Sequence, residues 1–165
     1  MLNPLLDELR QEAATTRRVL ERVPADKLTW KPHSKSMSLG QLALHVANIP
    51  HNVSKLAQLD QYDASNTNFE PATPNNIDEI LSTHDLSLRT AEDYLNSIDD
   101  KIALASWRLT NKGKEVFTIP RIGLIRSIML NHWYHHRGQL SVYLRLLDIP
   151  VPTIYGRSAD ENPFG

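Results

Sequence analysis

The chain has 165 residues, which suits one domain, spanning 1–165, around a single hydrophobic core. Its net charge of −1 at pH 7 gives no basic face, so we expect no nucleic-acid partner. It has no cysteine, which excludes disulfides and thiolate ligands from within the chain. The sequence shows neither an apolar run long enough to span a membrane nor a signal peptide at its start, so we expect a cytoplasmic protein without a membrane partner.

The first half of the chain contains two segments with the apolar period of an amphipathic helix. The first helix is predicted over about 4–23, with Asn3 as its N-cap. The second is predicted over 39–59, after the N-cap Ser38, with a kink or a break at Pro50 because the apolar period resumes beyond it.

The second half of the chain contains two further predicted helices. One covers 77–98, after a polar loop at 61–76, and the longest covers 120–147. Between them, 103–120 has β-compatible residues around the turn signal NKGK and could form a short hairpin or a loop. The proline-containing tail that follows is expected to be extended. Four such helices predict an all-α protein, a four-helix bundle.

The stretch NHWYHHRGQL, residues 131–140, places three histidines in the fourth predicted helix. At about 100° per residue, the centre and one flank of the apolar stripe of this helix are set by Ile125, Met129, Tyr143, Ile128 and Leu146. On this wheel His132 and His136 straddle the centre of the stripe, one turn apart. His135 lies at its edge, and Arg137 lies on the polar side.

A further histidine, His45, lies on the apolar stripe of the second predicted helix. Buried imidazoles cost free energy unless their nitrogens find partners, and a metal ion would satisfy one nitrogen of each. Three imidazoles and one open position are typical of a catalytic zinc site, and nickel, iron or copper suit the same ligands. The alternative is that these histidines are core residues that bond one another or a buried water.

The remaining histidines are weaker candidates as ligands. His84 points inward on the third predicted helix and is interpreted as pocket lining or an outer-sphere neighbour of the metal. His33, in a loop, and His51, on a polar face, are expected to be solvated.

Several other side chains are expected around the metal. The candidates for the pocket are Glu12, Trp30, His84, Gln139, Tyr143 and Tyr155. Gln139 could bond a substrate or water, while Trp30 and Tyr155 could instead close the end of the core. Glu12 could act as a general base or support a histidine, or be a partly solvated residue near the end of the bundle. Arg137 could anchor an anionic group or pair with a surface acid.

Two quoted stretches carry a resemblance to a known family. HWYHHRGQLSVYLRLLDIPVPTIYGRSADE and LTWKPHSKSMSLGQLALHVANIP resemble the DinB-like (DinB/YfiT) superfamily, and the likeness is weakest from about 60 to 118. The resemblance implies a four-helix bundle of the up-down-down-up type with a long crossover connection. It also implies a divalent metal, often nickel or zinc, held here by His45, His132 and His136, and a homodimer.

The resemblance also narrows the chemistry. The family includes metal-dependent hydrolases and S-transferases that use low-molecular-weight thiols such as mycothiol or bacillithiol. We therefore expect a small-molecule substrate and activation of a thiol or water at the metal. The alternative is a non-catalytic, metal-binding stress-response protein in which the metal only stabilises the fold.

Overall fold

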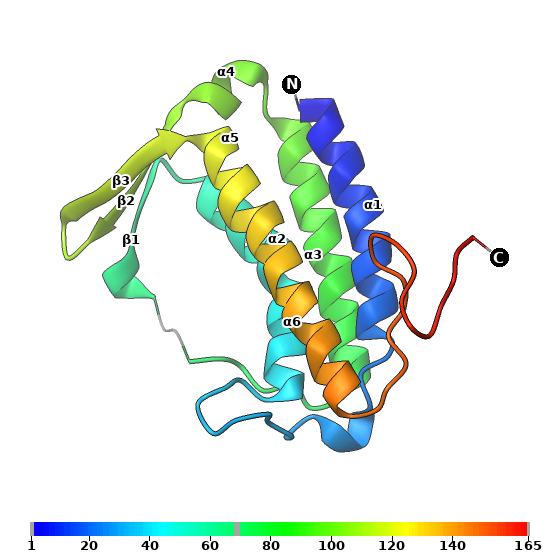
Figure 1. The fold of residues 1–165 in the computed structure, drawn as a ribbon. Coiled ribbons are helices and arrows are strands. Elements are labelled where there is room, and N and C mark those ends of the chain that lie inside the picture. Colours follow the sequence, from blue (N-terminus) through cyan, green and yellow to red (C-terminus); the bar gives the residue numbers. More distant parts are fainter. Residues whose placement is uncertain (1, 68–69, 165) are drawn as a thin grey trace.

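The computed structural model describes residues 2–67 and 70–164, and most of this chain is helical (Figure 1). The α-helices are α1 Leu2–Leu20, α2 Leu39–Ala57, α3 Ile77–Ser97, α4 Asp100–Leu104, α5 Arg121–Leu124 and α6 His132–Leu146. Short 3₁₀ turns are η1 Ala25–Lys27 and η2 Ala64–Asn66, and a π-helical segment, η3 Ile125–Asn131, joins α5 to α6. The strands are β1 Gln61–Asp63, β2 Ser106–Asn111 and β3 Lys114–Pro120.

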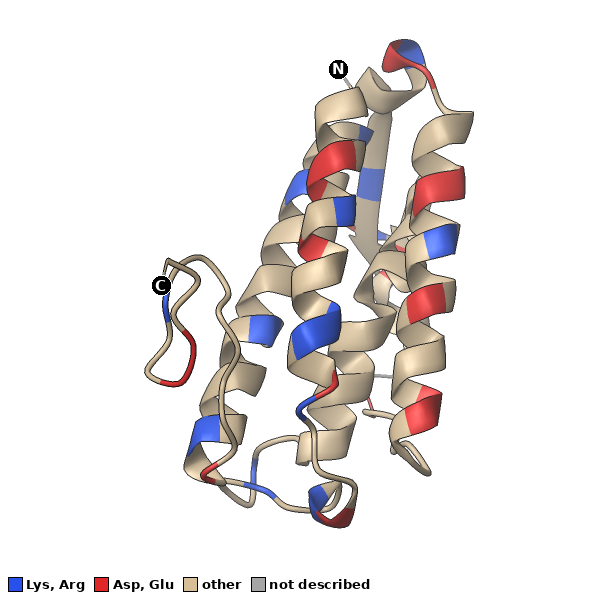
Figure 2. Ribbon diagram, turned by 90° about the vertical axis from the view of Figure 1, so that its right-hand side faces the viewer, with Lys and Arg blue, Asp and Glu red and all other residues tan. Residues whose placement is uncertain are grey.

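The long helices pack side by side around one hydrophobic core. Helix α2 packs against α3 on one side and against α6 on the other, and α1 contacts both α3 and α6. Leu9, Leu42, Ile80 and Leu140 are fully buried and represent the four long helical segments in this core. Acidic and basic residues are mixed along the outer faces of the helices (Figure 2). Among the described residues, no helix is long and apolar enough to cross a membrane.

The ends of the predicted helices follow local capping chemistry. Ser38 begins α2 with a capping box: its side chain accepts from the Gln41 amide, and the Gln41 side chain accepts from the Ser38 amide. Helix α2 runs unbroken through Pro50, so the break considered there does not occur. Helix α1 begins at Leu2 and ends at Leu20, so the predicted N-cap at Asn3 and end at 23 were wrong.

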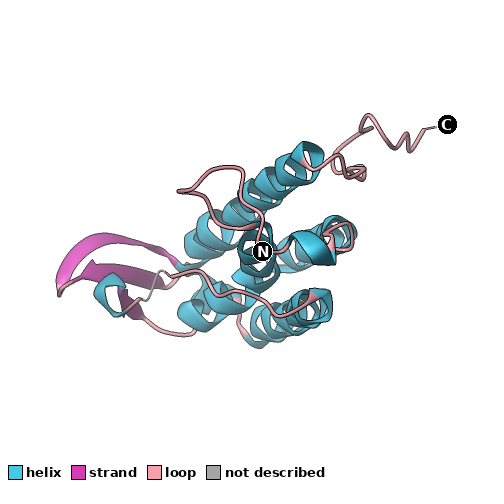
Figure 3. Ribbon diagram, turned by 90° about the horizontal axis from the view of Figure 1, so that it is seen from below, coloured by secondary structure: helices cyan, strands magenta, loops and turns pink. Residues whose placement is uncertain are grey.

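A small sheet lies to one side of the helices (Figure 3), so the all-α prediction was incomplete. Strands β2 and β3 form a hairpin, which was one of the two alternatives that the sequence allowed for 103–120. Strand β1 lies in the stretch that was predicted as a polar loop, and it pairs in parallel with β2. Asp63, at the end of β1, accepts from the backbone amides of Lys112 and Gly113 in the hairpin turn, at 3.0 and 2.8 Å. Hydrogen bonds from the Ser65 side chain and amide, together with those from Gly113 and Lys112, lower the pKa of Asp63.

The C-terminal tail forms no helix or strand in its described part but is anchored to two helices. Glu161 pairs with Arg18 on α1 at 2.7 Å and with Arg22, in the turn that follows α1, at 2.8 Å. Asp160 pairs with Arg145 on α6 and accepts from the Val151 amide. The tail therefore bridges α1 and α6, which the expectation of a simply extended segment had missed.

The fourth predicted helix is present but changes its geometry within its first half. Ile125 and Met129 are buried as predicted, whereas Ile128 and Leu146 are 38% and 58% exposed. The buried face of α6 consists of Trp133, Arg137, Leu140 and Leu144. The i→i+5 bonding of the π segment turns the chain by less than 100° per residue. A helical wheel drawn at a constant 100° per residue through this segment therefore assigns the residues after it to the wrong face of the helix. His132 and His136 consequently lie at the edge of the core, half-buried.

Candidate metal centre

Three histidines from two helices meet at the edge of the core. His45 comes from the middle of α2, and His132 and His136 come from the first two turns of α6. Their potential ligand atoms all lie within 4.8 Å of one another. The Nε2 atoms of His45 and His132 are 3.3 Å apart, and the ring centres of His132 and His136 are 4.3 Å apart. This histidine triad could hold a metal ion, because three imidazoles present nitrogen atoms to one point.

Electrostatics keep the triad in the neutral form that binds metals. Burial, reinforced by the charges of His136 and His132, lowers the pKa of His45 from 6.5 to about 4. Burial also lowers the pKa values of His132 and His136, and neighbouring imidazoles lower them further. All three rings are therefore neutral at pH 7, with lone pairs available for coordination.

Gln139 supports the triad from one turn further along α6. Its side-chain oxygen lies 2.7 Å from Nδ1 of His136. An amide oxygen only accepts hydrogen bonds, so this contact places the ring hydrogen on Nδ1 and leaves Nε2 with its lone pair. Such outer-sphere contacts fix the tautomer and orientation of a ligand, and Gln139 serves His136 in this way.

The triad opens into a pocket of about 560 Å³, which is within the usual range for small-molecule sites. Along with the triad, the described residues that line it are Met37, Gln41, Leu44, Asn48, Asn52, Thr67, Glu70, Pro71 and Ala72. Helix α2 thus forms one wall, and Thr67 together with residues 70–72 lines the opposite side.

The predicted aromatic residues Trp30 and Tyr143 lie behind the rim of this pocket. Their rings meet edge to face, 5.8 Å apart, and the Tyr143 hydroxyl donates to the backbone oxygen of Met37 at 3.4 Å. Met37 itself lines the pocket. Trp30 and Tyr143 therefore shape the pocket through Met37, and neither forms part of its lining.

Other predicted residues lie away from the triad. His84 is buried on α3, where its ring is 6.3 Å from that of Trp133, and its nitrogens make no hydrogen bond with the described residues. His135 is exposed, and its ring lies 5.0 Å from His136 without joining the triad. His33 is exposed as expected, whereas His51 is half-buried and its Nδ1 lies 3.1 Å from the Thr90 hydroxyl.

Arg137 and Glu12 form a buried ion pair that the sequence interpretation had not found. Arg137 is 1% exposed, and its guanidinium lies 2.6 Å from a carboxylate oxygen of Glu12. It also donates to Thr16 at 3.1 Å and to the Tyr155 hydroxyl at 2.5 Å, and Tyr155 donates to Glu12 at 3.1 Å. The placement of Arg137 on a polar face and of Glu12 as a partly solvated residue was therefore wrong. Tyr155 belongs to this cluster and does not line the pocket.

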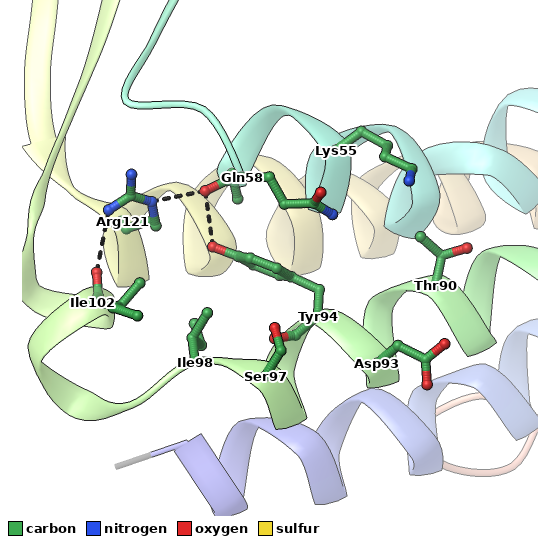
Figure 4. A pocket seen from close by; sticks show the side chains of 10 residues that line it. Lys55, Gln58, Thr90, Asp93, Tyr94, Ser97, Ile98, Ile102 and Arg121 are labelled. Atoms are coloured by element: carbon green, nitrogen blue, oxygen red, sulfur yellow. Dashed lines mark hydrogen bonds between the residues drawn. The ribbon is translucent and has the colours of Figure 1, made fainter.

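A second pocket, of about 610 Å³, lies between the ends of α2 and α3 and the start of α5 (Figure 4). Its most buried polar groups are already bonded: the Tyr94 hydroxyl and the Arg121 guanidinium both donate to the backbone oxygen of Ala57. Lys55, on its rim, is ten residues beyond His45 in α2, or about 15 Å along the helix axis. This pocket is therefore separate from the triad.

Comparison of the sequence with models of known protein families identifies the family of this chain. The sequence model of the DinB family matches residues 1–162, so the chain belongs to the DinB family. No curated protein matches this sequence significantly.

Solved structures of three DinB-like proteins share the fold. One from Bacillus subtilis is 20% identical with a TM-score of 0.72, covering 94% of this chain and 100% of that one. One from Bacillus cereus ATCC 10987 is 20% identical with a TM-score of 0.68, covering 91% and 95%. A DinB family protein from Exiguobacterium sibiricum is 21% identical with a TM-score of 0.65, covering 92% and 95%. At this identity the likeness concerns the fold alone.

Replacing Gln139 tests its support of His136. Gln139→Ala is expected to weaken zinc binding about 10- to 100-fold, because the ring loses the partner that fixes its tautomer. Gln139→Glu keeps an accepting oxygen and should bind zinc nearly as tightly as the unmodified protein. Calorimetric titration measures all three affinities. An affinity of Gln139→Ala equal to that of the unmodified protein would contradict the role assigned to Gln139.

The pKa of His45 predicts how the metal-free protein responds to pH. The unfolded imidazole titrates near 6.5 and the folded one near 4, so between these values the unfolded state binds more protons. The free energy of unfolding should therefore rise as the pH increases from about 4 to 6.5. His45→Asn should show a shallower rise in urea denaturation measured across this range. Identical slopes for the two proteins would show that His45 folds without a lowered pKa.

Breaking the buried ion pair should strongly destabilise the fold. Arg137→Met leaves the Glu12 carboxylate without its partner, which is expected to cost about 3–5 kcal/mol of unfolding free energy. Arg145→Met removes a surface arginine from the same helix and should cost about 1 kcal/mol or less. Chemical denaturation measures both. Equal losses in the two variants would mean that the Glu12–Arg137 pair does not stabilise the core.

Proposed function

We propose that this protein binds a divalent metal ion, zinc or nickel, through His45, His132 and His136, and that the centre acts on a small substrate as a thiol S-transferase or a hydrolase. The observation that carries the proposal is a triad of neutral imidazoles at the wall of a pocket of about 560 Å³. Family membership and the triad together are compatible with metal binding.

The chemistry of the donor set fits a catalytic ion. Among the described residues, no fourth histidine, aspartate or glutamate joins the group, so the protein supplies three ligands. A divalent ion held by three imidazoles, with an open position, acts as a Lewis acid and lowers the pKa of a water or thiol that binds it. The chain has no cysteine, so any thiol comes from outside.

Residues of this chain have separate tasks in the proposal. His45, His132 and His136 hold the ion, and Gln139 orients His136. The walls of the pocket exclude bulk water from one side of the triad and position the substrate. The up-down-down-up four-helix bundle and the homodimer that the family resemblance implies remain predictions, as does the cytoplasmic location expected from the sequence.

Cobalt substitution tests the proposal. The unmodified protein and His135→Ala should each bind one cobalt ion per chain, whereas His136→Ala and His132→Ala should lose stoichiometric cobalt. The visible spectrum of the bound cobalt should shift when a small thiol such as 2-mercaptoethanol is added, because the thiol occupies the open position.

The control His135→Ala separates the triad from its neighbour in sequence. Loss of cobalt in His135→Ala alone would contradict the ligand set. Cobalt that binds but does not respond to thiols or anions would leave the alternative, a non-catalytic metal-binding protein in which the ion only stabilises the fold.

A further inference from the structure

Carboxamide side chains form a row beside the triad on α2. Gln41, Asn48 and Asn52 all line the triad pocket, at four residues before, three after and seven after His45. These spacings put them on the same face of the helix as His45, each about one turn from the next ligand or carboxamide. A ligand bound at the triad therefore lies beside this row.

The three carboxamides differ in what they already bond. The Gln41 side chain accepts from the Ser38 amide and donates to the Pro71 oxygen and the Thr73 hydroxyl, the last two at 3.2 Å. Its oxygen and nitrogen therefore already have partners within the protein. The side chains of Asn48 and Asn52 make no hydrogen bond within the described residues. Their amide groups, each with two donors and one acceptor oxygen, are available to a ligand.

The charge of the pocket wall is also distinctive. Among the described residues that line the pocket there is no lysine or arginine, and apart from the histidines the only ionisable side chain is Glu70. Carboxylates and phosphates of ligands are typically held by arginine or lysine. A bound divalent ion attracts one anionic donor to its own open position. A second anionic group beside Asn48, which is half-buried, would lose part of its hydration without gaining a cationic partner.

We propose that Asn48 and Asn52 determine specificity by recognising an uncharged, amide- or hydroxyl-bearing part of the ligand, and that the pocket disfavours ligands with a carboxylate or phosphate at that place. This inference rests on the proposed function, because it takes the triad as the point where the reacting group binds. It defines a class of substrate or co-substrate by charge and hydrogen bonding.

A pair of matched thiols tests the proposal. N-acetylcysteinylglycine and N-acetylcysteinylglycinamide have the same thiol and amide groups and differ only in that the first ends in a carboxylate. Each is titrated into the cobalt-loaded protein, and its dissociation constant is read from the cobalt spectrum. The neutral amide should bind about tenfold more tightly than the carboxylate, because only the carboxylate loses hydration without finding a cation.

Two variants locate the effect. Asn52 is exposed, so Asn52→Lys should fold normally, and it should remove or reverse the preference by giving the carboxylate a partner. Gln58→Lys adds the same charge directly after the end of α2, outside this pocket, and should leave the preference intact. Asn48→Ala should weaken binding of the neutral thiol about fivefold without changing cobalt stoichiometry, because only the ligand loses a partner.

The outcomes separate this inference from the proposed function. Cobalt that fails to bind refutes the metal centre, and the inference falls with it. Cobalt that binds, with both thiols bound equally or the carboxylate bound more tightly, refutes the inference alone. Cobalt that binds with neither thiol bound also refutes it, while the metal site stands. An unchanged preference in Asn52→Lys shows that the row does not set specificity.

Discussion

The π-helical segment at Ile125–Asn131 decides which side chains of α6 enter the core and which face the pocket. Its wider turns change the phase of the helix just before His132. As a result Trp133 and Arg137 point into the core, while His132 and His136 meet His45 of α2 at the edge of the core. A regular helix through this segment would turn a different set of side chains toward the core, and the triad would not form in this way.

The contacts of the buried Arg137 side chain hold α6 in this orientation. Residues 136 and 137 are neighbours in sequence but serve opposite sides of α6, the first facing the triad and the second facing α1. The Arg137 guanidinium also lies 5.3 and 5.1 Å from the ring centres of Tyr134 and Tyr155. Buried charge of this kind is tolerated because the guanidinium finds a carboxylate, hydroxyls and aromatic faces together. It therefore sets the rotation of α6 and, with it, the direction of His136.

The tail adds a second constraint on the same helix. Tyr155 contacts the Arg137–Glu12 pair, and Glu161 pairs with Arg18 on α1 and with Arg22 just after it. The last part of the described chain thus joins α1 to α6 on the side away from the triad pocket. Segments that do not belong to the histidine triad therefore support its position from the opposite side of α6.

Local patterns were enough to predict much of this arrangement. The long helices, the N-cap at Ser38 and the one-turn spacing of His132 and His136 follow from short-range spacing and apolar period. The direction in which His132 and His136 point does not, because the helical wheel assumed a regular helix through Ile125–Asn131. The π segment could not be predicted, because nothing in IRSIMLN distinguishes it from a regular helix; it depends on packing against the rest of the core. Strand β1 was missed because its three residues pair with β2, more than forty residues away. The Glu12–Arg137 pair had a usable signal, since an acidic residue on an apolar stripe requires a buried cation.

X-ray absorption spectroscopy of the zinc-loaded protein tests the central claim, a three-histidine centre with an open position, most directly. The account predicts three imidazole nitrogens at about 2.0–2.1 Å and one further light-atom ligand that exchanges for sulfur at about 2.3 Å when a thiol is added. A shell with fewer than three imidazoles, or a fourth ligand that no thiol displaces, would contradict it.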